Sequence, residues 1–191
     1  PDIKILHFWD NSFRHFTNRV RPFREPKDCE GIRTRTLPSE FHGHIYRRLG
    51  FDPAAQNIKD FITEIEISEF DGHDNPLTNI YHFNVHKYHR YITLTGHISS
   101  VCGLYVNLTL YEGWPDDVRE AVDAAALEAT NIQRALAIEE DIEQLKKFDP
   151  AENEIIHLTG AEWQKFIDVV TPIIDEQRTI IGDELVDLAL S

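Results

Sequence analysis

The stretch PDDVREAVDAAALEATNIQRALAIEEDIEQLKKF, residues 115–148, carries the strongest structural signal in the chain. Its apolar residues recur at intervals of three and four positions, which places side chains on one face of an α-helix. These residues are Val118, Val122, Ala126, Ala129, Ile132, Leu136, Ile142 and Leu145. The pattern predicts one helix of about 30 residues up to Phe148, which is long for a compact domain.

Shorter elements alternate on both sides of this helix. Strand patterns occur at residues 3–9, 32–37, 91–98, 101–111 and 153–158. Helices are predicted to begin after a capping residue or at a proline, namely at Ser39, Asn57, Pro76 and Thr159. Pro172 is expected to bend or restart the helix after Thr159, and a last helix should end near Leu190. The alternation predicts an α/β protein.

The composition excludes several classes of protein. The 191 residues contain 19 Lys and Arg against 33 Asp and Glu, and this net charge of −14 would repel a nucleic acid backbone. No run of 18 apolar residues occurs, and two cysteines supply neither a disulfide framework nor a CxxC metal site. No nucleophile motif of a hydrolase is present. We therefore expect a folded protein with no enzymatic activity, no cofactor and no nucleic acid partner.

Basic residues nevertheless gather in one part of the chain, residues 14–48, where a small anion could bind. Arg35 follows the Gly31 turn in an expected strand, so its planar guanidinium would be rigidly placed to pair with a carboxylate. A solvated surface position is the alternative. Trp9, near Arg14, could line a ligand site or belong to the core.

The stretch FDGHDNPLTNIYHFNVHKYHRY, residues 70–91, raises the possibility of a metal site. If residues 80–90 form one helix, His82, His86 and His89 share a face and could approach a metal, together with Asp71 or Asp74. The complete ligand pattern of a zinc site is absent, so solvent-exposed histidines are the favoured interpretation.

The beginning of the same stretch places Asp71, His73 and Asp74 within four positions. They could form an acid–base pair or part of a loop of oxygen ligands. The favoured interpretation is a turn, because Asp-Gly and Asn-Pro both occur commonly in turns.

Several blocks, in this order, resemble the solute-binding receptor of tripartite ATP-independent periplasmic (TRAP) transporters. They are FWDNSFRHFTNRVRPFREPKDCEGIRTR, LG, FDGHDNPLTNIY, RYITLTGH and WPDDVREAVDAAALEATNIQRALA. The similarity covers essentially the whole chain. It implies a two-lobed α/β fold of the periplasmic-binding type, a small organic carboxylate as ligand, a periplasmic location and the TRAP membrane subunits as partners.

The resemblance also implies roles for single residues. Arg35, which ends GIRTR, corresponds to the arginine that forms the main salt bridge to the ligand carboxylate. Asn75 in DGHDNPL corresponds to an asparagine that contacts the same carboxylate, and Arg14 in SFR to an arginine that often adds a second contact. His73 and Asp74 replace the usual Gln and Glu beside the ligand.

In this family the long helix connects the lobes. The resemblance therefore implies a ligand-binding lobe of residues 12–100 plus 140–191, and a partial second lobe of residues 1–11 plus 101–139 that includes part of the lobe-spanning helix near 115–148. We expect the N-terminal part of that second lobe to be absent from this chain. Tight binding would then require the missing half, as a second chain or otherwise, and a second copy of this chain is a further possible partner.

Two alternatives to carboxylate binding stay open. One is a metal-binding module or metal-dependent enzyme that uses the histidines at 82, 86 and 89. The other is a truncated structural remnant that binds no ligand.

Overall fold

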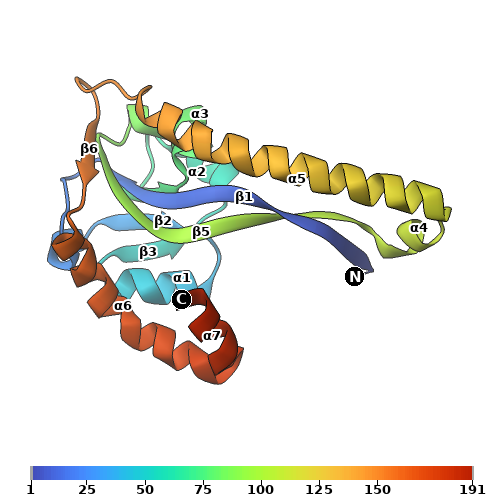
Figure 1. Ribbon diagram of the computed structural model, residues 1–191. Helices are drawn as coiled ribbons and strands as arrows, with labels where there is room; N and C mark the ends of the chain where they lie inside the picture. The colour runs from blue at the N-terminus through green and yellow to red at the C-terminus, as the bar shows by residue number, and fades with distance from the viewer. Residues whose placement is uncertain (1, 191) are drawn as a thin grey trace.

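The structure is a computed structural model that describes residues 2–190. One mixed sheet of six strands forms its centre, in the order β3-β2-β4-β1-β5-β6 (Figure 1). The strands are β1 (Ile3–Asn18), β2 (Arg33–Thr36), β3 (Asp52–Ala55), β4 (Gly72–Asn75), β5 (Tyr91–Asn107) and β6 (Glu154–His157). Strand β1 is antiparallel to both of its neighbours, whereas β2 is parallel to β3 and β4, and β5 is parallel to β6.

Helices lie on both sides of this sheet. They are α1 (Glu40–Arg48), α2 (Ile58–Glu64), α3 (Leu77–His82), α4 (Leu108–Glu112), α5 (Asp116–Leu145), α6 (Gly160–Ile181) and α7 (Asp183–Leu190), with short 3-10 helices η1 (Pro26–Cys29) and η2 (Val85–Lys87). Helix α5 runs along the long strands β1 and β5, and α1 and α6 lie on the opposite side of the sheet (Figure 1).

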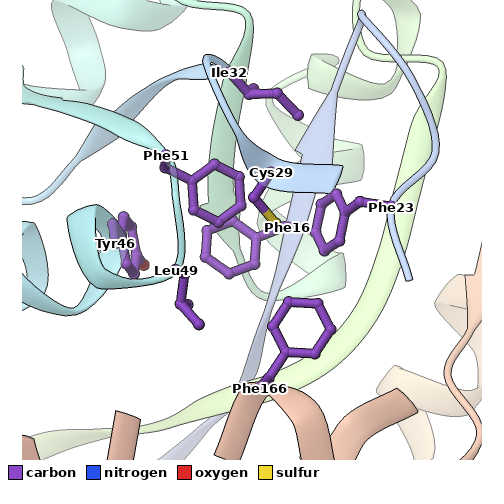
Figure 2. Close-up of a cluster of buried hydrophobic side chains, with 8 residues drawn as sticks. All are labelled: Phe16, Phe23, Cys29, Ile32, Tyr46, Leu49, Phe51 and Phe166. Atoms are coloured by element: carbon purple, nitrogen blue, oxygen red, sulfur yellow. The ribbon is translucent and has the colours of Figure 1, made fainter. Parts of the chain in front are cut away.

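A separate hydrophobic core covers each face of the sheet. Phe16 lies at the centre of the first, where its ring stacks on Phe51 at 4.7 Å between centroids and meets Tyr46 edge-on at 5.0 Å (Figure 2). The neighbouring residue Thr17 pairs with Ile92, which belongs to the second core. Because successive strand residues point to opposite faces, the two cores are separated by the sheet. The second core comprises Phe61, Ile65, Phe70, Leu77, Ile80, Val85, Ile92 and Phe148.

Elements with strong local signals form where the sequence predicts them. Helix α5 has 30 residues. The side chain of Ser39 caps α1, that of Asn57 caps α2, and Thr159 with Glu162 forms a capping box at the start of α6. These predictions are confirmed because each cap satisfies backbone N–H groups within its own first turn.

Two predictions about element boundaries are wrong. The two expected strands at 91–98 and 101–111 form a single strand, β5, which ends at Asn107 because that side chain accepts a hydrogen bond from Leu110 N and starts α4. The expected restart of the helix at Pro172 does not occur, because α6 continues through it to Ile181. A proline removes one helical hydrogen bond, and here the remaining turns hold the helix together.

Several residues of the apolar face of α5 are exposed in this chain, although their periodicity predicts that they are buried. The buried positions are Ala126, Thr130, Ala137 and Gln144, whereas Ile132, Leu136 and Ile142 are each more than half exposed. The outer halves of β1 and β5 also expose large apolar side chains, including Val101 and Tyr105. We call a set of exposed apolar residues of these three elements the outer apolar surface. Its members are Ile3, Ile5, Val101, Tyr105, Leu127, Ile132, Leu136, Ile138 and Ile142. Within residues 2–190, no helix is both long and apolar enough to span a membrane.

Gly72 is required where β4 packs between β1 and β2. A Cβ atom there would lie 2.9 Å from Thr34 Oγ1, 3.2 Å from Ile32 Cγ2 and 3.3 Å from the Thr17 carbonyl oxygen. We predict that Gly72→Ala lowers the free energy of unfolding in urea by about 1–3 kcal/mol, because the strand must shift to make room. The control is Gly160→Ala, where nothing lies within 4 Å. Equal effects of the two substitutions would contradict this packing.

His89 makes stability depend on pH. It is buried in the second core, and burial, with a smaller contribution from Arg19, lowers its pKa to about 3. Between that value and the unfolded pKa near 6.5, the unfolded chain binds a proton that the folded chain does not, so stability falls as pH decreases. We predict that this one residue lowers the free energy of unfolding by about 2 kcal/mol when the pH falls from 7.5 to 5.0.

Urea unfolding of His89→Gln at both pH values tests this prediction. The variant should lose less stability on acidification than the wild type, whereas the control His82→Gln, at an exposed position, should behave as the wild type does. An unchanged pH dependence in His89→Gln would refute the assignment.

Candidate functional site

The candidate site lies where the three adjacent strands β2, β4 and β1 meet. Arg14 is on β1, Arg35 on β2, and Asp74 and Asn75 are the last residues of β4. The register places Asn75 opposite His15 on β1 and places His73 opposite Arg35 on β2. The antiparallel pairing thus brings residues 60 positions apart into contact, and each side chain stands on a strand that fixes its backbone.

Arg14 is buried, and each of its three guanidinium nitrogens donates a hydrogen bond. Its Nε donates to Asp74 Oδ2, its Nη2 donates to the Asp74 carbonyl oxygen, and its Nη1 donates to Asn75 Oδ1 at 3.2 Å. Several hydrogen bonds to one guanidinium give a strong, directional ion pair. The positive charge of Arg14 is therefore compensated within this chain.

Asp74, the partner of Arg14, is also buried. Burial alone would raise its pKa, but His97, whose Nε2 lies 3.6 Å from Asp74 Oδ2, and the charge of Arg14 more than offset this and hold the pKa of Asp74 below its usual range. The carboxylate is thus ionised at neutral pH. Its other oxygen, Oδ1, has no hydrogen-bond partner within residues 2–190.

Arg35 differs from Arg14, because it has no carboxylate partner. Only 1% of its surface is exposed, and its Nε donates to the Gln56 carbonyl oxygen at 2.8 Å. Burial lowers its pKa, and the more distant charge of Asp74 acts in the opposite direction. In the described part of the chain Arg35 forms no salt bridge, so its terminal nitrogens can receive an anion. An arginine stays protonated in proteins, and a buried charge of this kind requires a counter-ion.

Asn75 keeps one hydrogen-bond donor free. Its Oδ1 accepts from Arg14 and from Asn79 Nδ2 at 3.2 Å, and its Nδ2 lies 3.1 Å from His73 Nε2. An amide nitrogen carries two N–H groups, so one can donate to a ligand. The amide is oriented by these neighbours before any ligand arrives.

The expected turn at His73 and Asp74 is wrong, because both residues belong to the buried strand β4. The His73 ring stacks on Phe61 at 5.0 Å, and burial keeps its pKa well below the usual value, so this imidazole is neutral. Pairing with β1 and β2 outweighs the turn preference of Asp-Gly and Asn-Pro.

His97 and Tyr46 join the site although sequence reasoning assigned them no role. The His97 ring stacks on Phe16 at 4.1 Å, its Nδ1 lies 2.7 Å from Thr95 Oγ1, and its Nε2 lies 3.2 Å from the Tyr46 hydroxyl. His97 lies in the motif TGH, residues 95–97, but the motif does not reveal which side chains it contacts across the sheet.

Trp9 lies away from this cluster. Its indole nitrogen donates to Thr130 Oγ1 on α5 at 3.0 Å, so it anchors the long helix on β1. No hydrogen bond or ring contact connects it with Arg14 or Arg35 in the described residues.

The three histidines of the proposed metal site do not share one helix. Helix α3 ends at His82, His86 stacks on Tyr81 at 4.7 Å, and His89 is buried with its Nδ1 2.8 Å from Thr17 Oγ1. The expectation that all three are solvent-exposed is therefore wrong for His89. Among residues 2–190, no three His, Cys, Asp or Glu side chains form a group that could hold a metal ion.

We predict that Asp74→Asn lowers the free energy of unfolding by about 3–5 kcal/mol, because it leaves Arg14 buried without its counter-ion. Urea unfolding measures this loss. Asp71→Asn is the control, since it removes only the partly exposed pair with Arg19 and should cost no more than about 1 kcal/mol. Similar losses of stability in both variants would contradict the claim that the fold depends on the buried Arg14–Asp74 ion pair.

Two of the curated proteins similar to this chain are named for the organic acids that they bind. The C4-dicarboxylate-binding periplasmic protein DctP of Rhodobacter capsulatus is 27% identical over 182 residues, which cover 95% of this chain and 54% of that protein. The 2,3-diketo-L-gulonate-binding periplasmic protein YiaO of Escherichia coli is 25% identical over 88% of this chain and 51% of its own length. The chain spans about half the length of these relatives.

Solved structures confirm the α/β fold class. A TRAP periplasmic solute-binding protein from Ralstonia eutropha with bound (S)-2-acetolactate matches with a TM-score of 0.92 and 25% identity, over 98% of this chain and 62% of that one. Another from Shewanella oneidensis with bound succinate has a TM-score of 0.90 and 21% identity, over 97% and 61%. The sequence also matches the family described as bacterial extracellular solute-binding protein, family 7, over residues 1–179. The chain therefore belongs to family 7 of the bacterial extracellular solute-binding proteins.

Proposed function

We propose that the chain is the carboxylate-binding part of a periplasmic receptor, which captures a small organic acid and delivers it to the membrane subunits of a TRAP transporter. The observation that carries this proposal is Arg35, a buried guanidinium without a carboxylate partner in residues 2–190. A ligand carboxylate would supply the missing counter-ion and accept two parallel hydrogen bonds from the terminal nitrogens.

Asn75 and Arg14 support this role in different ways. Asn75 donates its free N–H to the same carboxylate. Arg14 contributes its positive charge, but because Asp74 already pairs with it, its main effect is to orient Asn75. The site is thus rigid before the ligand binds, which reduces the entropy lost on binding.

The similar proteins of known structure support an organic acid as the ligand class. Besides succinate and acetolactate, their described ligands include galactonate and galacturonate. A carboxylate is the group that these molecules share. The family consists of solute-binding proteins, so the proposed role is binding and transfer without chemical conversion.

We assign residues 12–100 plus 140–191 to the ligand-binding lobe, and residues 1–11 plus 101–139 to a partial second lobe. Except for Ile142, the residues of the outer apolar surface lie in this second part, and exposed apolar patches often mark surfaces that bind another polypeptide. We propose that the outer apolar surface is covered by polypeptide corresponding to the part of the relatives that this chain does not match, and that tight ligand binding requires this polypeptide.

Substitution of Arg35 by lysine tests the proposed function. Lysine keeps the charge but loses the planar pair of donors, so we predict that affinity for a carboxylate falls by on the order of 100-fold. Isothermal titration calorimetry on the intact natural protein measures this change, with a ligand chosen by a thermal-shift screen of carboxylates.

The matched control is Arg33→Lys on the same strand, because Arg33 pairs with Asp52 at 2.8 Å and Glu69 at 3.2 Å at the surface. This control should bind as the wild type does. Unchanged affinity in Arg35→Lys would contradict the proposed function.

A further inference from the structure

We infer that His73 is a positioning residue for ligand binding. Its imidazole accepts a hydrogen bond from one N–H of the Asn75 amide, which leaves the other N–H directed at the ligand carboxylate. This inference rests on the proposed function and deepens it, because it names the residue that determines how Asn75 presents its donor. The hydrogen bonds around Asn75, the fixed position of the His73 ring and the strand register of Arg35 support it.

The neighbours of Asn75 favour one orientation of its amide. Its Oδ1 lies 3.2 Å from Arg14 Nη1 and 3.2 Å from Asn79 Nδ2, and both of these nitrogens are donors. Rotation of the amide by half a turn would place its NH2 group against these two donors and lose both hydrogen bonds. The NH2 group therefore points to His73, whose Nε2 lies 3.1 Å from Asn75 Nδ2.

The His73 imidazole is the acceptor in this contact. An amide nitrogen only donates, so Nε2 of His73 carries no proton, and the proton of the neutral ring lies on Nδ1. Burial keeps the pKa of His73 well below its usual value, so Nε2 remains free to accept. Within residues 2–190 the Nδ1 atom has no hydrogen-bond partner, so no competing contact favours the opposite tautomer.

The His73 ring is held in place by its surroundings. None of its surface is exposed, and the ring stacks on Phe61 with 5.0 Å between centroids and 12° between planes. Its backbone lies in β4 between two neighbouring strands, where it pairs with Thr17 on β1 and Arg35 on β2. An acceptor fixed in this way orients the Asn75 amide before a ligand arrives, which reduces the entropy lost on binding.

The strand register places the free N–H of Asn75 on the same face of the sheet as Arg35. Arg35 is opposite His73 in the β2–β4 register, and Asn75 follows His73 by two residues on β4. Alternate residues of a strand face the same side, and neighbouring strands lie about 4.8 Å apart. A carboxylate on this face can therefore accept from the terminal nitrogens of Arg35 and from the N–H that His73 leaves free.

A double-mutant cycle tests whether His73 acts through Asn75. Calorimetry on the intact natural protein uses succinate, (S)-2-acetolactate, galactonate and galacturonate as probes, and the cycle uses the one that the wild type binds most tightly. Asn75→Ala should weaken binding about tenfold, as expected for one hydrogen bond to a charged group. His73→Leu should weaken binding about fivefold in the wild type but less than about twofold in Asn75→Ala. Equal effects in the two backgrounds, or no effect in the wild type, would overturn the inference.

Two further variants separate positioning from a general loss of stability. His73→Gln supplies a side-chain carbonyl that can accept the same N–H, so its affinity should stay within about twofold of the wild type. His89→Leu is the matched control, because His89 is also buried and meets Phe61 edge-on but forms no hydrogen bond with Asn75 in the described residues. It should lower the free energy of unfolding and leave the affinity unchanged. Equal losses of affinity in His89→Leu and His73→Leu would contradict a positioning role.

Nitrogen-15 NMR of the imidazole rings gives a readout that needs no ligand. At neutral pH His73 should show the tautomer with its proton on Nδ1, whereas a proton on Nε2 would overturn the inference. If urea unfolding shows that His73→Leu does not fold, this tautomer and the affinity of His73→Gln decide.

The outcomes separate this inference from the proposed function. If Arg35→Lys and Asn75→Ala weaken binding but the effects of His73→Leu and Asn75→Ala are additive, the carboxylate site stands and the positioning role fails. If none of the four acids binds, or if Arg35→Lys and Asn75→Ala both bind as the wild type does, the proposed function fails together with the inference.

Discussion

The buried ion pair between Arg14 and Asp74 is the constraint on which the candidate site depends. It crosses from β1 to β4 at the centre of the sheet and joins residues that are 60 positions apart. Removing two charges from water is costly, so the fold must keep the β1–β4 register that satisfies both. The same register orients Asn75 and places Phe16, the centre of the first core, opposite Asp74. Packing and site geometry are therefore set together.

Arg35 stands out by contrast with the neighbouring Arg14–Asp74 pair. One strand away from a compensated pair, it is equally buried and lacks a carboxylate partner in the described residues. A protein that needed only stability would gain little from such a charge, because its desolvation is not offset. In a binding protein the same arrangement is useful, because the unpaired cation and the oriented amide of Asn75 are ready for an anion. The compensated pair also fixes the charge of the site, which limits the ligands that fit it.

Features that depend on residues close together in the sequence could be predicted, whereas features that depend on contacts between distant segments could not. Helices α1, α5 and α6 could be predicted because caps and apolar periodicity are local. The convergence of Arg14, Arg35 and Asn75 came from the resemblance to TRAP receptors, since no local pattern reveals which strands are neighbours. The burial of His73 and His89, the position of Trp9 on α5 and the participation of His97 depend on contacts between distant segments. Such contacts outweighed the local turn and helix signals around residues 70–91.

The most direct measurement of the central claim is a crystal structure of the intact natural protein grown with an organic acid that it binds. The account predicts that both oxygens of the ligand carboxylate lie about 3 Å from the terminal nitrogens of Arg35, with Arg14 and Asp74 still paired. A carboxylate bound elsewhere, with the Arg35 guanidinium occupied by a carboxylate of the protein itself, would contradict it.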